Sequence, residues 1–130
     1  MEQSDYNKTH LFLITGGSDG FHQACFALQL ALTFMGAGVE VIIYLSSDAA
    51  KWAHKETNRD QKLCGGQSLD FYLNELLTYG AKILVCGTCV MENCNIQDAH
   101  EMQNNLLEGI ECAGISKIAE LSLKSKVFNF

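Results

Sequence analysis

Short, unbroken apolar runs recur along this chain, with longer segments between them. His10–Ile14 and Val39–Leu45 are two such runs, and Lys82–Val85 supplies a third that leads into Cys86. Runs of this length are typical of strands that are buried on both faces of a sheet. Parallel sheets with a helix layer on each face contain such strands, so the runs predict an α/β fold.

The segments between these runs have helical patterns. Phe21–Met35 is apolar nearly all round, which predicts a helix buried on two sides, the second side against a neighbouring subunit. The other predicted elements are a short helix carrying Trp52, helices over 68–80, 96–103 and 115–123, and strands over 110–113 and, at an edge, 126–130. We therefore expect a single domain over residues 1–130, a three-layer α/β/α sandwich with a mainly parallel five-stranded sheet.

The charge balance limits the classes of partner. The formal net charge is −6, with 15 acidic and 9 basic residues, which disfavours nucleic acids and anionic membrane surfaces. No apolar run approaches the ~18 residues of a membrane span. The polar, acidic segment Met1–Asn7 does not resemble a secretory signal. We expect a cytoplasmic protein. Structural disulfides are rare in that compartment, so we expect the six cysteines to serve core packing or chemistry.

Three of the six cysteines, Cys86, Cys89 and Cys94, fall within nine positions directly after a predicted strand. The carboxyl ends of parallel strands form the crevice in which α/β proteins bind ligands. A cysteine between a strand end and a following helix also meets the helix N-terminus, which favours the reactive thiolate. We predict these three residues as the catalytic thiols, with Cys86 as the nucleophile.

The remaining cysteines have different settings. Cys25 and Cys112 lie inside apolar segments, and we expect both in the core. Cys64 lies beside two glycines in a polar loop, where either a reactive thiol or an ordinary loop residue is consistent with the sequence.

A zinc site and a thioredoxin-like site are the alternative interpretations of the cysteine cluster. Cys86, Cys89 and Cys94 with His100 or Cys112 would supply four ligands, but the second closely spaced ligand pair of a structural zinc site is missing. A thioredoxin fold sets a cis-proline against its cysteines, and this chain has no proline. We expect neither a metal nor a cofactor, while a Cys86–Cys89 disulfide with a regulatory or resolving role stays open.

A glycine-containing turn, Gly16–Gly20, follows the first strand. It lacks the lysine and the spacing of a P-loop and does not match Gly-x-Gly-x-x-Gly. We predict a tight strand-to-helix turn whose Ser18 or Asp19 caps the next helix and whose amides are able to hold a small anion. We expect His22, at the start of that helix, on the surface.

The chain resembles the DsrE/DsrF-like sulfur-relay family over nearly its whole length. The resemblance lies in the opening strand with its Gly-Gly turn, in the segment Leu69–Val85, and in the closing segments 107–115 and 127–130. Its most specific part is Val85–Cys89, Val-Cys-Gly-Thr-Cys, which is similar to TusD-like subunits and to the DsrE-like domain of YedF-type proteins.

This resemblance implies a persulfide mechanism. The cysteine at the end of this strand accepts a sulfane sulfur from a donor and passes it on, and Cys86 occupies that position. Cys89 matches the second cysteine of the Cys-Gly-Thr-Cys variants. Where many members have an Arg-Gly pair, this chain has Glu92 and Asn93, followed by Cys94 as a second candidate acceptor.

The expected function is therefore that of a sulfur carrier or sulfurtransferase. Its expected partners are sulfur donor and acceptor proteins or small sulfane-sulfur species, within a homo-oligomeric dimer, trimer or hexamer. The alternatives are a non-catalytic or regulatory subunit of a sulfur-relay assembly and a thiol–disulfide redox or metal-binding module.

Overall fold

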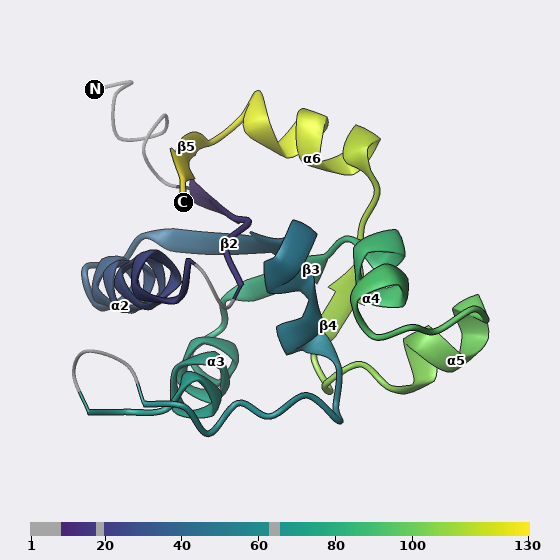
Figure 1. Ribbon diagram of the computed structural model, residues 1–130. Coiled ribbons are helices and arrows are strands. Elements are labelled where there is room, and N and C mark those ends of the chain that lie inside the picture. The colour runs from purple at the N-terminus through teal and green to yellow at the C-terminus, as the bar shows by residue number, and fades with distance from the viewer. Residues whose placement is uncertain (1–8, 18–19, 63–65) are drawn as a thin grey trace.

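The apolar runs form one five-stranded sheet in the order β4-β3-β2-β1-β5 (Figure 1). The structure is a computed structural model that describes residues 9–17, 20–62 and 66–130. Its elements in chain order are β1 (Thr9–Ile14), α2 (Phe21–Gly36), β2 (Glu40–Leu45), the 3₁₀ helix η1 (Ser47–Ala53), α3 (Leu69–Thr78), β3 (Lys82–Val85), α4 (Gly87–Asn93), α5 (Ala99–Asn104), β4 (Ile110–Cys112), α6 (Ile115–Ser122) and β5 (Lys126–Asn129). All four strand pairings are parallel, so the predicted α/β fold with a five-stranded sheet is confirmed.

Helices cover both faces of the sheet, but unequally. Alternate strand residues point to opposite faces, so Phe12 faces α2 and α3 while its neighbour Leu11 faces α6. The α2–α3 face carries the larger core, and α6 covers the other face with Ile118 against Leu84 and Tyr44. Each fully buried Leu, Ile or Phe side chain contributes about 1.5–3 kcal/mol to stability, so the α2–α3 face supplies most of it.

Helix α2 has buried and exposed apolar side chains. Cys25 is fully buried, as expected, and Leu28 beside it is 1% exposed. Phe26, on the outer side, is 57% exposed. A neighbouring subunit against this side stays a prediction.

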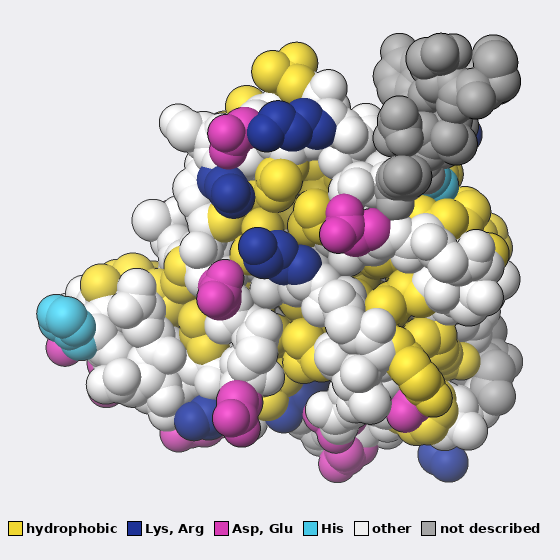
Figure 2. All heavy atoms as spheres, turned by 180° about the vertical axis from the view of Figure 1, so that it is seen from behind, with side chains coloured by type: hydrophobic (Ala, Val, Ile, Leu, Met, Phe, Trp, Pro, Cys, Tyr) yellow, Lys and Arg dark blue, Asp and Glu magenta, His cyan; other side chains and the backbone are white. Residues whose placement is uncertain are grey.

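The face in Figure 2 has a broad apolar area on one side, and elsewhere its Lys and Arg side chains are interleaved with Asp and Glu. Within the described parts of the chain, no helix is both long and apolar enough to cross a membrane.

The predicted short helix carrying Trp52 is confirmed as the 3₁₀ helix η1, which buries Ala49, Ala50 and Trp52. The predicted helix over 96–103 begins only at Ala99, because the Asp98 carboxylate accepts a hydrogen bond from the His100 amide and so caps α5 there.

The carboxyl ends of three neighbouring strands align at one edge of the sheet. Leu45 of β2 pairs with Val85 of β3, which pairs with Cys112 of β4. The ladder continues one residue further, since the Cys86 amide donates to the Leu45 carbonyl at 2.9 Å and the Ala113 amide to the Val85 carbonyl at 3.0 Å. This register fixes the position of Cys86 at the edge where ligand crevices form in α/β proteins.

Candidate functional site

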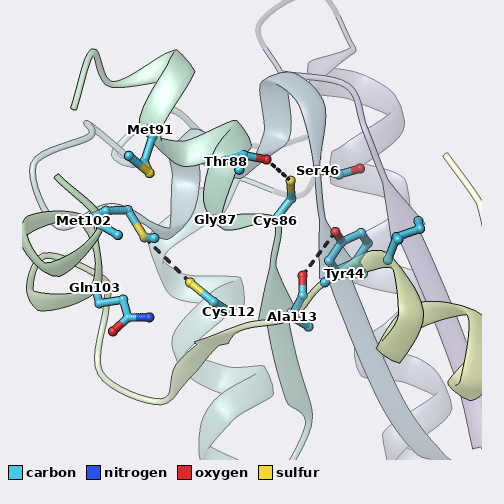
Figure 3. Close-up of a pocket in the computed structure, with 13 residues that line it drawn as sticks. Tyr44, Ser46, Cys86, Gly87, Thr88, Met91, Met102, Gln103, Cys112 and Ala113 are labelled. Carbon is cyan, nitrogen blue, oxygen red and sulfur yellow. Dashed lines mark hydrogen bonds between the residues drawn. The ribbon is translucent and has the colours of Figure 1, made fainter. Parts of the chain in front are cut away.

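A pocket of about 680 Å³ lies at this carboxyl edge (Figure 3). Its walls come from the ends of β2, β3 and β4 and from α4, α5 and α6. The lining residues are Tyr44, Ser46, Cys86, Gly87, Thr88, Met91, Ala99, Met102, Gln103, Cys112, Ala113, Gly114 and Ile115. The volume lies within the ordinary range for small-molecule sites.

Cys86 joins β3 to α4 and faces this pocket. It is the N-cap residue of α4, with an extended backbone, and its Sγ accepts a hydrogen bond from the Cys89 amide at 3.4 Å. The Thr88 hydroxyl lies 3.3 Å from the same sulfur, as Figure 3 shows. The thiol side chain of Cys89 and the hydroxyl of Tyr44 also hydrogen-bond to it.

These hydrogen bonds determine the protonation of Cys86. Burial raises the pKa of the Cys86 thiol, but the Cys89 thiol, the Thr88 hydroxyl, the Cys89 amide and Tyr44 together lower the pKa below its ordinary value. Among the residues that the structure describes, no Lys, Arg or His side chain lines the pocket. The thiolate is therefore stabilised by neutral donors.

The pKa of Cys89 shifts in the opposite direction. Burial, the hydrogen bond to Cys86 and the charges of Cys86 and Glu92 raise the pKa of Cys89, while a hydrogen bond from the Ser47 backbone lowers it. Cys89 thus stays a neutral thiol that donates to Cys86. The charge of Glu92 acts against a thiolate at Cys89.

Tyr44 is the neutral donor from β2. Burial and the charge of Cys86 raise the pKa of Tyr44 to about 12, so its hydroxyl keeps its proton near neutral pH. That hydroxyl also lies 3.5 Å from the Ala113 carbonyl oxygen. Tyr44 is not among the site residues predicted from the sequence; the signal that could have found it is its place near the end of a strand that neighbours β3.

Cys112 only partly matches its expected place in the core. It packs against the core, yet it is partly exposed and lines the pocket with Cys86. Its thiol donates to the Met102 sulfur at 3.6 Å, and burial and the charge of Cys86 raise its pKa. The expectation assumed a strand interior, whereas Cys112 is the last residue of β4, where side chains reach the crevice.

Gly87 keeps the space between Cys86 and this second thiol open. A Cβ at Gly87 would lie 3.0 Å from the Met102 methyl carbon and 3.3 Å from Cys112 Sγ. Met91 also lines the pocket, so its walls carry four sulfur-containing side chains.

Cys94 lies away from the other two predicted thiols. It is the C-cap residue of α4, whereas Cys86 is the N-cap residue. Eight residues of helix rise separate them by roughly 12 Å. Cys94 packs against the core and is not among the residues that line the pocket.

Helix α4 is fixed by the backbone of Ser47. The Asn93 side-chain amide donates to the Ser47 carbonyl at 2.6 Å, and the Ser47 backbone hydrogen-bonds to Cys89. Ser47 has φ 52°, in the left-handed region that non-glycine residues rarely adopt. The loop after β2 thereby holds both ends of the short helix that carries the thiols.

The glycine turn after β1 is tightly packed. A Cβ at Gly16 would lie 2.8 Å from the Gly20 Cα, and one at Gly17 would lie 2.5 Å from the Asp48 Cβ. Glycine is therefore required by close packing, which agrees with the predicted tight turn. The predicted caps Ser18 and Asp19, and also Cys64, lie outside the described residues.

His22 is exposed, as expected, and does not line the pocket. In the described part of the chain, no group of three or more His, Cys, Asp or Glu side chains has a geometry that could hold a metal ion. The cysteines described there form no disulfide.

Comparisons with known proteins agree on the fold. Residues 8–130 match the DsrE/DsrF-like family. A search of curated proteins found no match. Among solved structures, the YchN protein from E. coli is similar, with a TM-score of 0.76 and 19% identity, covering 95% of this chain and 99% of that chain.

Two further structures, both of proteins of unknown function, have the same fold. MTH1491 from Methanobacterium thermoautotrophicum has a TM-score of 0.69 and 12% identity, covering 95% of this chain and 100% of that chain. BT1422 from Bacteroides thetaiotaomicron has a TM-score of 0.60 and 17% identity, covering 97% of each chain.

Proposed function

Because the chain belongs to the DsrE/DsrF-like family, we propose that it carries sulfane sulfur as a persulfide on Cys86 within a sulfur relay. Family membership supports a role related to sulfur relay. The observation that carries the finer proposal is the setting of Cys86, a pocket-facing thiol whose pKa is lowered by four neighbouring hydrogen-bond donors, although burial alone would raise it. A thiolate is the form of cysteine that attacks sulfur.

The loading step is a transfer between two sulfur atoms. The Cys86 thiolate attacks the outer sulfur of a donor persulfide, R–S–SH, and the new S–S bond forms as the old one breaks. The electron pair of the broken bond leaves with the donor as R–S⁻, and Cys86 becomes Cys86–S–SH. The step needs no external oxidant or reductant.

Unloading has two routes. An acceptor thiolate attacks the outer sulfur and regenerates the Cys86 thiolate, which is the same transfer in the other direction. Alternatively, the neighbouring Cys89 loses its proton and its thiolate attacks the inner sulfur, which forms a Cys86–Cys89 disulfide and releases the outer sulfur as hydrosulfide, HS⁻. Cys89 is hydrogen-bonded to Cys86, whereas Cys94 is too distant for direct attack.

Intact mass measurement tests the proposal. Reduced protein incubated with a persulfide donor is expected to gain one sulfur atom that cyanide removes, and Cys86→Ser is expected to gain none. Cys94→Ser is the matched control and is expected to load like the wild type. Loading that is unchanged in Cys86→Ser would exclude Cys86 as the carrier.

A second candidate function is thiol–disulfide exchange by Cys86 and Cys89. The two thiols are hydrogen-bonded and their pKa values move in opposite directions, as in a pair that has one attacking and one resolving sulfur. Equilibration of the protein with glutathione redox buffers, which measures the potential of a Cys86–Cys89 disulfide, distinguishes the two candidate functions. A reversible Cys86–Cys89 disulfide near the cytosolic potential, without sulfur loading, would favour this candidate over the persulfide carrier.

The proposed setting is the cytoplasm, where a reducing environment keeps Cys86 available as a free thiol. Rapid, stoichiometric alkylation of Cys86 in the native protein would also distinguish the carrier from a non-catalytic subunit.

A further inference from the structure

Negative charge is concentrated in the part of the chain that builds the pocket. Between Lys82 and Lys117 the sequence has five acidic residues and no Lys or Arg, so this segment carries a formal charge of −5 out of the total of −6. The same segment supplies eleven of the thirteen residues that line the pocket.

Apart from the Cys86 thiolate, the described residues of the pocket wall are uncharged, and the acids that we call the rim adjoin them in the sequence. All thirteen lining residues are neutral types. Four exposed acids directly neighbour lining residues in sequence: Glu92 follows Met91, Asp98 precedes Ala99, Glu101 precedes Met102, and Glu111 precedes Cys112.

Three cations on neighbouring elements offset little of this charge. Lys117 of α6 lies 3.8 Å from Glu120, so its charge is partly offset locally. Lys82 begins β3, and strand geometry separates it from Cys86 by roughly 13 Å. Lys55 donates to the Asn104 carbonyl at the end of α5 and supplies one positive charge against the charges of the four acids.

We infer that the partner docking at this pocket is a protein segment that presents its cysteine or cysteine persulfide among Lys and Arg residues. This inference rests on the proposed function and names the donor or acceptor class for it. An apolar pocket with a thiolate inside an acidic rim attracts a cationic segment and repels an anion, because a charged rim changes the local concentration of charged species. Thiosulfate, a doubly charged anion, is accordingly a poor donor.

The first measurement probes the field around Cys86 without any sulfur transfer. Cys86 is labelled with limiting amounts of two methanethiosulfonate reagents, one with a cationic trimethylammonium-ethyl group and one with an anionic sulfonato-ethyl group. Peptide mapping gives the rate of each reagent with Cys86, which is divided by its rate with free cysteine. This normalised rate is expected to be about tenfold higher for the cationic reagent at low salt. The difference is expected to shrink at ~1 M salt, where the screening length is ~3 Å.

Two charge-reversal variants are matched. Glu101→Lys, on α5, is expected to reduce the preference of Cys86 for the cationic reagent severalfold. Glu40→Lys makes the same charge change at the start of β2, at the opposite end of the sheet, and is expected to leave it unchanged. An equal preference in both variants would overturn the inference.

The second measurement uses sulfur donors. Two peptides of equal length carry a cysteine persulfide flanked by Lys in one and by Glu in the other, and thiosulfate is the third donor. The Lys-flanked peptide is expected to load Cys86 about tenfold faster than the Glu-flanked one. Equal loading by all three overturns the inference alone, whereas no loading by any of them overturns the proposed function and the inference with it.

Discussion

At the scale of single residues, the reactivity of Cys86 depends on neutral neighbours. Thr88, Cys89 and Tyr44 all donate hydrogen bonds to its sulfur, and burial opposes them. Hydrogen bonds to a charged group are worth about 1.5–3 kcal/mol, more than neutral ones. A thiolate therefore persists in a pocket whose described lining residues include no cation.

Tyr44→Phe tests this arrangement. Loss of the hydroxyl removes one donor, so the pKa of Cys86 is expected to rise and its alkylation near neutral pH to slow severalfold. The pH profile of the alkylation rate measures both. Tyr72→Phe is the control, because its hydroxyl accepts from Gln29 on α2, away from the pocket. If the pH profile of the alkylation rate in Tyr44→Phe matched that of the wild type, the role of Tyr44 as a hydrogen-bond donor to Cys86 would be contradicted.

The thiols around the pocket are expected to react in a fixed order as the pH rises. The pKa of Cys86 is lowered, and those of Cys89 and Cys112 are raised chiefly by burial. The Cys86 thiolate therefore persists at pH values where ordinary cysteines are protonated, and the other two ionise only above that range. Limited alkylation with peptide mapping is expected to label Cys86 first, and prior labelling of Cys112 would disprove the order.

The sequence predicted Cys86 more fully than it predicted its surroundings. A cysteine after an apolar run has a position that the run itself determines, because parallel strands end at one edge. Tyr44 and Cys112 reach the same pocket only through strand register, which pairs residues far apart in the chain. Cys94 is close to Cys86 in the sequence, but the two residues lie at opposite ends of α4.

At the scale of elements, α4 is a short helix that depends on its anchors. Seven residues are too few for a helix to be stable by propensity alone. The Ser47 backbone holds it through Asn93 and Cys89. The geometry of the thiols thus depends on the loop that follows β2.

Asn93→Ala is expected to loosen α4. Loss of the 2.6 Å hydrogen bond to Ser47 is expected to cost about 1 kcal/mol of unfolding free energy and to slow Cys86 alkylation, because the Cys89 donors shift. Urea denaturation and alkylation rates measure these effects. Ser68→Ala removes the cap of α3 at a similar cost of about 1 kcal/mol and is expected to spare Cys86. Equal alkylation rates in the two variants would contradict the anchoring role.

Elements with strong patterns were predicted closely. The predicted helix Phe21–Met35 differs from α2 by one residue, because its apolar pattern and the following glycines mark both ends. The start of α5 was predicted less accurately, since a turn or two of helix has too few residues to establish a period and depends on local caps.

At the scale of the whole molecule, the sheet has two halves with different roles. β2, β3 and β4 end at the pocket, while β1 and β5 build an aromatic cluster. In that cluster Phe12 stacks on Phe128 with a centroid distance of 5.0 Å and on Phe130 at 5.9 Å, and Phe34 packs against Phe128 at 5.6 Å. Stacked aromatic pairs add about 0.5–1.5 kcal/mol beyond the area they bury.

Phe128→Ala is therefore expected to lower the unfolding free energy by about 2–3 kcal/mol, somewhat less than a fully buried phenylalanine, because Phe128 is half-buried. Val127→Ala, the exposed neighbour on the same strand, is expected to change it by less than about 0.5 kcal/mol. Denaturant titration compares the two. The folded Phe128→Ala protein is expected to keep the Cys86 alkylation rate of the wild type, and a slower rate would show that the two halves are coupled.

The strand order β4-β3-β2-β1-β5 thus separates the pocket from the aromatic cluster. Under the proposed function, substitutions that retune donor preference fall on the elements around the pocket, whereas substitutions that set thermal tolerance fall on β1 and β5. One property is therefore expected to change while the other is retained. A protein engineer can exploit the same division, redesigning the surroundings of the pocket on a scaffold whose aromatic half is left untouched or reinforced first.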